Sequence, residues 1–136
     1  GGLICGSSSP IYTLSKHAVV ALSENLHHDL TSRNTQIGCS VLCPGWVRTS
    51  IVESDRNRQA APQLTEKMTY TRQRFQQGVN TGIEPDAVGT MVVDAIRDEK
   101  FYIHTHPDWL KIVQQRFEAI LDGKRPAISR IPNPKK

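Results

Sequence analysis

The chain lacks long apolar runs. Apolar residues make up 38% of its 136 residues, and no run approaches the ~18 consecutive apolar residues that span a membrane. It also lacks the charged and then apolar leader of a secreted protein. Composition therefore predicts a cytoplasmic protein without a membrane partner.

Cysteine is scarce, and its placement argues against a disulfide framework. Of the three cysteines, Cys39 and Cys43 lie at either end of a short apolar segment. Four residues of strand would separate them by about 13 Å, which is too far for a disulfide. We interpret both as small buried residues in a reducing compartment.

Spaced sets of metal ligands are missing as well. His104 and His106 would share one face of a strand, and His27 and His28 lie in a helical segment. Two ligands without a spaced third or fourth make a weak site. The pattern favours histidines at the surface or at strand ends, and it predicts no metal centre.

The glycine-rich turn that binds the pyrophosphate of a dinucleotide is also absent. No G-x-G-x-x-G sequence occurs, and the acidic or basic residue that would select NAD or NADP is missing with it. Nor does the chain open with Met. These absences predict that the residues form the C-terminal half of a longer protein.

The patterns that are present alternate between helix and strand. Residues 10–32 have the period of a helix, with Ser9 as its N-cap and Pro10 as its first residue. Asn34 marks a turn, and a short apolar strand follows over residues 36–42. The first third of the chain is therefore predicted to be helix, turn and strand.

The remaining chain continues the alternation. A polar stretch to about residue 83 contains a predicted helix with an apolar side of Leu64, Met68, Phe75 and Val79. Pro85 opens a helix whose apolar side holds Val88, Met91, Val92, Ala95 and Ile96. A strand over residues 101–105 ends before Pro107. A last amphipathic helix begins near Trp109 and stops near Gly123.

Strand, helix and strand in this order imply a parallel pair joined by a right-handed crossover. Parallel sheets are buried on both faces and need neighbouring strands, so two strands alone do not make a stable sheet. The pattern therefore predicts an α/β fold in which the strand at residues 36–42 pairs with a further strand from outside this chain.

Tyr12 and Lys16 carry the clearest chemical signal. Their spacing of four residues at the start of a helix places the phenol and the ammonium on one face. A cation held beside a phenol favours the phenolate, so the pair could give and take a proton near neutral pH. A plain surface pair is the alternative, because this spacing also arises by chance.

A second motif follows the first predicted strand. Residues 44–49 read PGWVRT, and on its own the pair Pro44 and Gly45 has the form of a type II turn. In order and separation, however, this motif and residues 12–16 (YTLSK), followed by small and apolar helix residues, resemble the short-chain dehydrogenase/reductase family. The two motifs together are far more specific than either one.

The resemblance implies a nicotinamide-dependent oxidoreductase. Its cofactor would be NAD or NADP, and its substrate a small carbonyl compound or alcohol. Tyr12 would act as the catalytic acid and base beside the cofactor. Lys16 would activate the phenol and would donate hydrogen bonds to the nicotinamide ribose.

The resemblance also assigns the second motif to the cofactor. The turn of Pro44 and Gly45 would let the backbone approach the nicotinamide closely. The main chain of Val47 would bind the carboxamide, and the Thr49 hydroxyl would reach the carboxamide or a diphosphate oxygen.

Substrate contacts are implied for two further residues. Trp46 and Ile51 fall where the family has a mobile substrate-binding loop, which implies an apolar carbonyl compound or secondary alcohol. Packing is the alternative for both, as it is for Met68, Tyr70 and Phe75. The long charged stretch could equally be solvated, since it holds Glu53, Asp55, Arg56 and Arg58.

In this family the catalytic serine lies thirteen positions before the tyrosine, and counting back from Tyr12 passes the first residue. Ser7 and Ser8 are therefore interpreted as loop residues. Residues 1–123 would form the C-terminal part of one doubly wound, Rossmann-like NAD(P)-binding domain, comprising the catalytic helix, the last two strands and the substrate-loop helices. Residues 124–136 would form a basic tail with prolines, and the fragment alone would be inactive.

The resemblance implies a homodimer or homotetramer, because the tyrosine-bearing helix of the family packs against a partner subunit. One alternative is a truncated, noncatalytic member that acts through this dimer interface, to which the helix would offer Leu22, Leu26 and Leu30. Another is a nucleic-acid-binding module that uses the basic end of a chain with net charge +4, with salt-sensitive affinity. Extended prolines without interleaved aromatics favour a solvated end, so no nucleic-acid partner is predicted.

Overall fold

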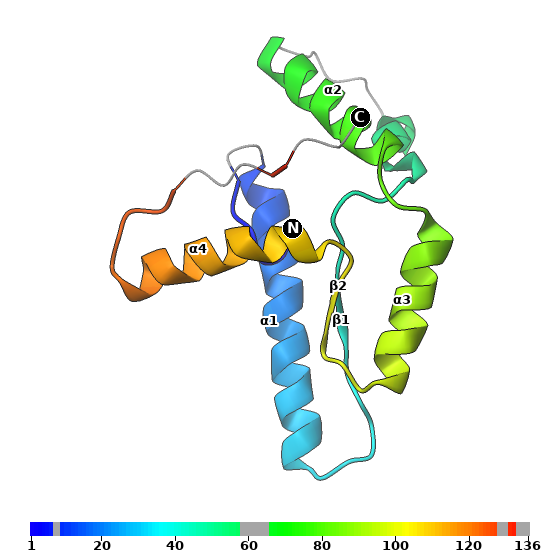
Figure 1. Cartoon of the computed structure of the whole chain (residues 1–136), viewed down its shortest axis with the longest axis vertical. Helices are drawn as coiled ribbons and strands as arrows, with labels where there is room; N and C mark the ends of the chain where they lie inside the picture. Colours follow the sequence, from blue (N-terminus) through cyan, green and yellow to red (C-terminus); the bar gives the residue numbers. More distant parts are fainter. Residues whose placement is uncertain (7–8, 58–65, 128–130, 133–136) are drawn as a thin grey trace. The chain divides into compact units, whose positions relative to one another are not determined.

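The computed structural model describes residues 1–6, 9–57, 66–127 and 131–132, in which helices and strands alternate (Figure 1). The elements are α1 (Pro10–Ser32), β1 (Val41–Cys43), η1 (Ser50–Asn57), α2 (Glu66–Asn80), α3 (Pro85–Arg97), β2 (Tyr102–His104), η2 (Pro107–Trp109) and α4 (Leu110–Leu121). The α/β class predicted from the sequence is confirmed.

The chain forms two compact units. The first comprises Gly1–Gly45 and Thr90–Pro132, and the second is built around Trp46–Gly89. The first unit therefore holds α1, both strands and α4, the second holds η1 and α2, and α3 runs from the second into the first. The division into a domain of residues 1–123 and a tail of residues 124–136 stays a prediction.

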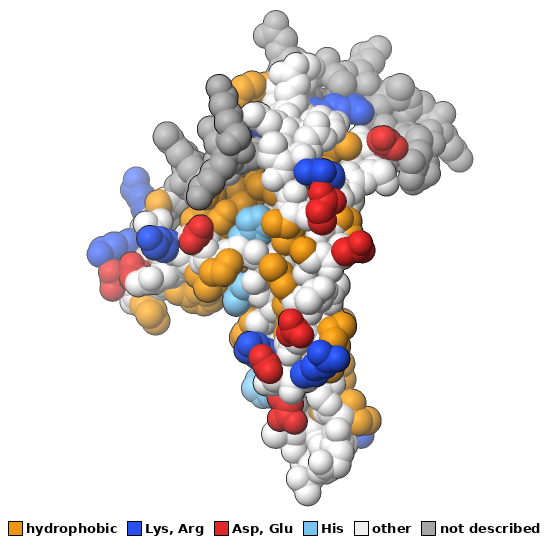
Figure 2. Space-filling view, turned by 45° about the vertical axis from the view of Figure 1, so that its right-hand side comes forward, with side chains coloured by type: hydrophobic (Ala, Val, Ile, Leu, Met, Phe, Trp, Pro, Cys, Tyr) orange, Lys and Arg blue, Asp and Glu red, His pale blue; other side chains and the backbone are white. Residues whose placement is uncertain are grey.

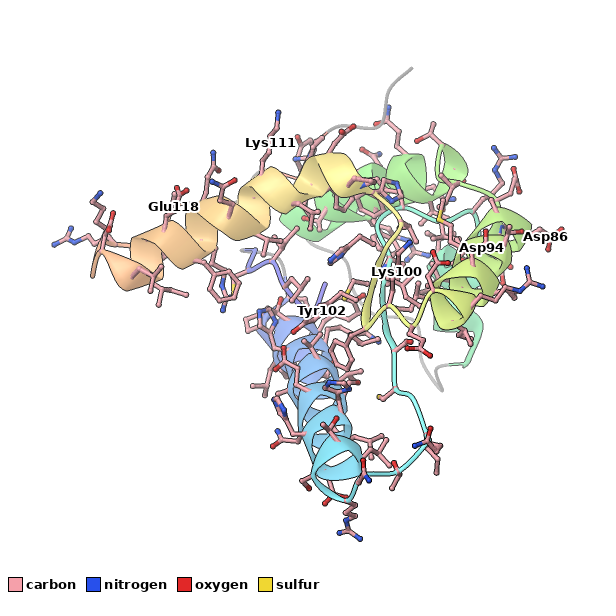
Figure 3. All side chains as sticks on the ribbon, turned by 60° about the horizontal axis from the view of Figure 1, so that its bottom comes forward. Asp86, Asp94, Lys100, Tyr102, Lys111 and Glu118 are labelled. Carbon is pink, nitrogen blue, oxygen red and sulfur yellow. The ribbon has the colours of Figure 1, made fainter. Side chains whose placement is uncertain are left out.

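β1 and β2 pair in parallel, as the element order predicts. Val41 lies opposite Tyr102 and Cys43 lies opposite His104. In Figure 1 the two strands run side by side, with α1 on one side and α3 on the other. Tyr102 points toward α1 in Figure 3, and its hydroxyl donates a hydrogen bond to Glu24 of that helix at 2.5 Å.

The strands are shorter than their apolar patterns. β1 covers Val41–Cys43, so the predicted start at residue 36 is wrong, and β2 is one residue shorter at each end than residues 101–105. An apolar pattern marks residues that suit a strand, whereas the ladder extends only where a partner faces it. Just before β1, a side chain bonds to the other segment: the Ser40 hydroxyl donates a hydrogen bond to the Lys100 carbonyl at 2.8 Å.

Three helices end in a residue with left-handed backbone conformation. The angle φ is 52° at Asn34 after α1, 55° at Glu99 after α3 and 61° at Gly123 after α4. In each case the next N–H donates to a carbonyl five residues earlier, as from Thr35 to Leu30 at 3.1 Å. The predicted turn at Asn34 and stop at Gly123 are confirmed. Glycine and asparagine suit this conformation, whereas Glu99 adopts it at a cost.

Each unit has a small core. In the first unit the buried side chains are Val20, Val41, Ala95, Ile103 and Thr105, and in the second they are Val79 and Val88. Cys39 and Cys43 are half-buried, so their predicted burial is wrong. Within the described residues β1 has a neighbouring strand on one side only, so Cys43 at its end and Cys39 before it stay partly exposed to solvent. All three cysteines are free thiols.

The polar stretch between the motif at residues 44–49 and α3 forms two helices. α2 confirms the predicted helix, with Val79 buried and the Phe75 ring packed edge-on against Trp46 at 5.6 Å between centroids. The sequence did not predict η1 (SIVESDRN), in which Ile51 and Val52 are adjacent and every other residue is polar. Outside the described part lie Ser7, Ser8, Arg58 and Leu64, together with the side chains of Asp55, Arg56 and Met68.

Many apolar side chains stay on the surface, and Figure 2 shows them over much of one face. On α1, Leu22 is 70% exposed and Leu26 is also exposed, while Leu30 is half-buried. Leu22 and Leu26 therefore do not belong to a core formed by this chain. Among the described helices, none is long and apolar enough to cross a membrane.

Candidate active site

Tyr12 and Lys16 share one face of α1, as their spacing predicts. The Lys16 ammonium nitrogen lies 5.5 Å from the centroid of the Tyr12 ring, within the range of a cation–π contact. Tyr12 is 51% exposed and Lys16 is also exposed, so both can reach a ligand. The pair thus combines a proton donor with a fixed positive charge.

The first turn of α1 holds this pair in place without a side-chain cap. Ser9 occupies the predicted N-cap position in an extended conformation, and its carbonyl accepts the Thr13 N–H at 3.0 Å. The predicted N-cap position is confirmed, and the Ser9 side chain makes no capping hydrogen bond. One turn later the Ser15 hydroxyl donates to the Tyr12 carbonyl at 2.8 Å.

The backbone of the first two residues lies against the same face. A Cβ placed on Gly1 would fall 3.3 Å from Cε1 of Tyr12, and one on Gly2 would fall 2.5 Å from Cγ2 of Val20 and 2.7 Å from the Lys16 carbonyl oxygen. Gly2 therefore permits a close approach that a side chain would prevent. Sequence reasoning missed this contact, for which two successive glycines were the available signal.

Pro44 and Gly45 directly follow β1, also in the first unit. The turn there is not of type II, because Gly45 lacks the positive φ that this type requires. The Gly45 N–H donates to Oγ1 of Thr105 at 2.9 Å, and the Thr105 side chain is only 6% exposed. Gly1 and this turn line one small cavity of about 30 Å³. Because a Cβ on Gly1 would also meet the Tyr12 ring, Gly1 lies between the two motifs of the first unit.

His104 and His106 line the same cavity, so the predicted common face is confirmed. Burial lowers the pKa of both imidazoles, and the nearby Asp108 carboxylate partly opposes this for His106. Burial also raises the pKa of the Cys43 thiol. All of these groups therefore favour their neutral forms. Within the residues that the structure describes, no three His, Cys, Asp or Glu side chains are arranged to hold a metal ion.

The rest of the second motif belongs to the second unit. Val47 forms a parallel bridge with Ile83, in which Ile83 N–H donates to the Trp46 carbonyl at 3.0 Å and Arg48 N–H donates to the Ile83 carbonyl at 2.9 Å. In such a bridge the hydrogen bonds use the neighbours of Val47 and not its own N–H and C=O, which point the other way. Thr49 and Ile51 follow and are exposed.

Trp46 packs within its own unit. A Cβ placed on Gly78 of α2 would fall 2.5 Å from the indole ring, and one on Gly82 would fall 2.6 Å from the Trp46 carbonyl carbon. The Phe75 ring of α2 also packs against the indole ring of Trp46. The packing alternative for Trp46 is therefore met, and its contact with substrate stays a prediction.

Comparison with known proteins identifies the family. A family model described as short chain dehydrogenase matches residues 2–60. The chain is 30% identical over 134 residues to a CLA biosynthesis dehydrogenase/reductase of Lactiplantibacillus plantarum, a match that covers 93% of this chain and 47% of the relative. This chain belongs to the short-chain dehydrogenase/reductase family.

Other members agree in sequence and in structure. A short-chain dehydrogenase/reductase of Burkholderia phymatum, solved in complex with NAD, is 36% identical with a TM-score of 0.88, covering 96% of this chain and 48% of that one. The 15-hydroxyprostaglandin dehydrogenase [NAD(+)] of Rattus norvegicus is 27% identical over 72% of this chain and 36% of its own length. The chain thus spans about half the length of the relatives that it matches most extensively.

Proposed function

We propose that this short-chain dehydrogenase/reductase chain supplies the proton-transfer pair and the nicotinamide end of the cofactor site of an NAD- or NADP-dependent oxidoreductase. The observation that carries the proposal is the shared face of Tyr12 and Lys16, next to which Gly1 connects the pair to the turn after β1. Its substrate would be a carbonyl compound or an alcohol.

Proton transfer is the role of Tyr12. In the direction of reduction its hydroxyl donates a proton to the carbonyl oxygen, and in the direction of oxidation its phenolate removes the proton from the alcohol. The Lys16 ammonium can donate hydrogen bonds to ribose hydroxyls, which would hold the cofactor beside Tyr12. When bound, the nicotinamide supplies or accepts the hydride.

The residues after β1 fit a nicotinamide carboxamide. A carboxamide has both a hydrogen-bond donor and an acceptor. The C=O and N–H of Val47, which take no part in the bridge with Ile83, could pair with them. The exposed Thr49 hydroxyl can take a further polar group. These features support binding of NAD or NADP without selecting between them.

An alcohol substrate is supported by the names of relatives. One is the 1-deoxy-11-beta-hydroxypentalenate dehydrogenase of Streptomyces exfoliatus, 28% identical over 86% of this chain, and another is the rat 15-hydroxyprostaglandin dehydrogenase. Both names contain a hydroxy compound. We therefore propose an apolar secondary alcohol or the corresponding ketone as the substrate class, with Ile51 and Trp46 among its contacts.

The proposal is tested by Tyr12→Phe in the complete protein that carries this chain. Loss of the hydroxyl removes the transferable proton but keeps the ring, so turnover of a panel of ketones with NADH or NADPH should fall at least ~10²-fold while cofactor affinity changes little. Lys16→Met should reduce both. Tyr102→Phe makes the same chemical change at a residue outside the proposed site, whose hydroxyl bonds to Glu24, and is the matched control. Retention of most activity by Tyr12→Phe would remove Tyr12 from the mechanism.

A second candidate function is that of a noncatalytic member acting through a dimer interface. The exposed apolar side of α1 favours it, with Ile11 81% and Leu22 70% exposed. The homodimer or homotetramer proposed for the enzyme would use the same surface. Leu22→Glu should shift the elution volume of the protein toward the monomer in both cases. Only the noncatalytic function predicts no ketone turnover by the wild type with either cofactor.

A further inference from the structure

Thr105 has an unusual position for a buried hydroxyl. It directly follows β2, and its oxygen accepts the N–H of Gly45, a residue 60 positions away that lies just beyond the end of β1. The paired register of the two strands ends at Cys43 and His104. The hydroxyl thus continues the connection between the strands past the last backbone pair, and it fixes the Gly45 amide through a side chain.

His106 completes the hydrogen bonding of this hydroxyl. Its Nδ1 lies 2.8 Å from Oγ1 of Thr105. Because the oxygen already accepts the Gly45 N–H, the single hydroxyl proton is available for Nδ1. In the neutral tautomer with its proton on Nε2, Nδ1 accepts this proton, and burial, which lowers the pKa of His106, favours the neutral ring.

The ring of His106 also covers Gly45. A Cβ on Gly45 would fall 2.5 Å from Nδ1, 2.6 Å from Cγ and 2.9 Å from Cε1 of the imidazole, so any side chain there would displace the ring. The Trp109 ring packs against the same imidazole, with 4.9 Å between centroids. Glycine at position 45 is therefore required by the contact with His106, in addition to any requirement of a ligand.

We propose that Thr105 and His106 are positioning residues that hold the turn of Pro44 and Gly45 in the conformation that binds the nicotinamide end of the cofactor. They act through the backbone of Gly45 and need not touch the cofactor. Within the first unit, this amide is the last backbone N–H before the chain passes to Trp46 and Val47. The inference rests on the proposed function in naming the ligand, and its structural part rests on the hydrogen bonds and the ring contact.

The first test removes the hydroxyl in the complete protein that carries this chain. Thr105→Val keeps the side-chain shape but leaves the Gly45 N–H without its acceptor, so the dissociation constant for NADH or NADPH should rise roughly ten-fold. Thr105→Ser keeps the hydroxyl and should bind within about two-fold of the wild type. Thr31→Val is the matched control, because the Thr31 hydroxyl donates to the His27 carbonyl on the exposed surface of α1.

Amide hydrogen exchange of Gly45, measured without cofactor, gives a readout that does not depend on activity. It should speed up at least ten-fold in Thr105→Val and stay near the wild-type rate in Thr105→Ser and Thr31→Val. A wild type that binds neither NADH nor NADPH would overturn the proposed function and the ligand named here. A wild type that binds, with Thr105→Val binding equally well, would overturn the inference alone.

A second test uses the steric contact and remains informative if Thr105→Val folds poorly. Gly45→Ala should lower the midpoint of thermal unfolding, and the same change should lower it much less in a His106→Ala background, where the ring is absent. Equal losses in the two backgrounds would show that His106 does not hold the turn, and would overturn its part of the inference.

Discussion

At the scale of single residues, burial of two imidazoles makes stability depend on pH. The pKa values of His104 and His106 are lowered from 6.5 in the folded chain by burial, while the unfolded chain keeps the ordinary value. Between these values the unfolded state binds more protons, so the free energy of unfolding falls as pH drops below about 6.5. The contribution is fully present above that pH and is lost on acidification.

The measurement is urea unfolding at pH 7.5 and 5.5, for the wild type and for a variant with His104→Gln and His106→Asn. We expect the wild type to lose more stability on acidification than the variant. His28→Gln, on exposed α1, is the control that removes an exposed histidine in the same experiment. An equal loss in wild type and double variant would exclude these imidazoles as the cause.

Thiol reactivity is a second consequence at this scale. Cys5 is exposed, Cys39 and Cys43 are half-buried, and burial raises the pKa of the Cys43 thiol. Because the thiolate is the nucleophile, alkylation by iodoacetamide at pH 7.5 should modify Cys5 first and Cys43 last. Peptide mass spectrometry over time gives the order, and the three rates should converge in denaturant. Fast modification of Cys43 in the native chain would contradict the expectation.

At the scale of secondary-structure elements, the end of α3 is where the sequence fits its backbone least well. Glu99 has φ 55°, in a position where glycine carries no steric cost. Glu99→Gly should therefore raise the free energy of unfolding by about 0.5 kcal/mol, the steric gain of about 1 kcal/mol being partly offset by the entropy of glycine. Thermal unfolding tests this.

Asp98→Gly provides the control for this substitution. Asp98 neighbours Glu99 in the same turn but does not have a positive φ, so glycine there should only destabilise. If Glu99→Gly destabilised as much as Asp98→Gly, the left-handed conformation would carry no strain in solution.

The elements also show what a sequence can and cannot predict. α1 and α3 follow from residue periodicity, and the pairing of Tyr12 with Lys16 follows from a spacing of four, because both depend only on neighbours along a helix. The bond between Thr105 and Gly45 joins residues 60 apart, and no periodic pattern marks it. The predicted start of β1 at residue 36 is wrong for the same reason, because the length of β1 depends on where β2 lies opposite it.

At the scale of the whole molecule, we expect cofactor affinity to depend on a glycine-rich turn that these residues do not contain. No G-x-G-x-x-G turn occurs in the sequence, and this turn supplies much of the binding to the pyrophosphate. We therefore expect residues 1–136 alone to bind NAD and NADP more weakly than micromolar, and the complete protein to bind one of them at micromolar affinity or better. Calorimetric titration of both proteins is the measurement, and tight binding by residues 1–136 would contradict it.

The division of the chain into two units has a consequence for biosynthesis. The first unit combines Gly1–Gly45 with Thr90–Pro132, and the second unit is encoded between them. On the ribosome, β1 therefore emerges well before β2, and the contact of Glu24 with Tyr102 spans 78 positions. Until the later segment is translated, β1 lacks β2, its partner strand among the described residues, and an unpaired strand can join the strand of another nascent chain. Slow translation through Trp46–Gly89 would prolong that exposure, so codon choice in this segment bears on the yield of folded protein.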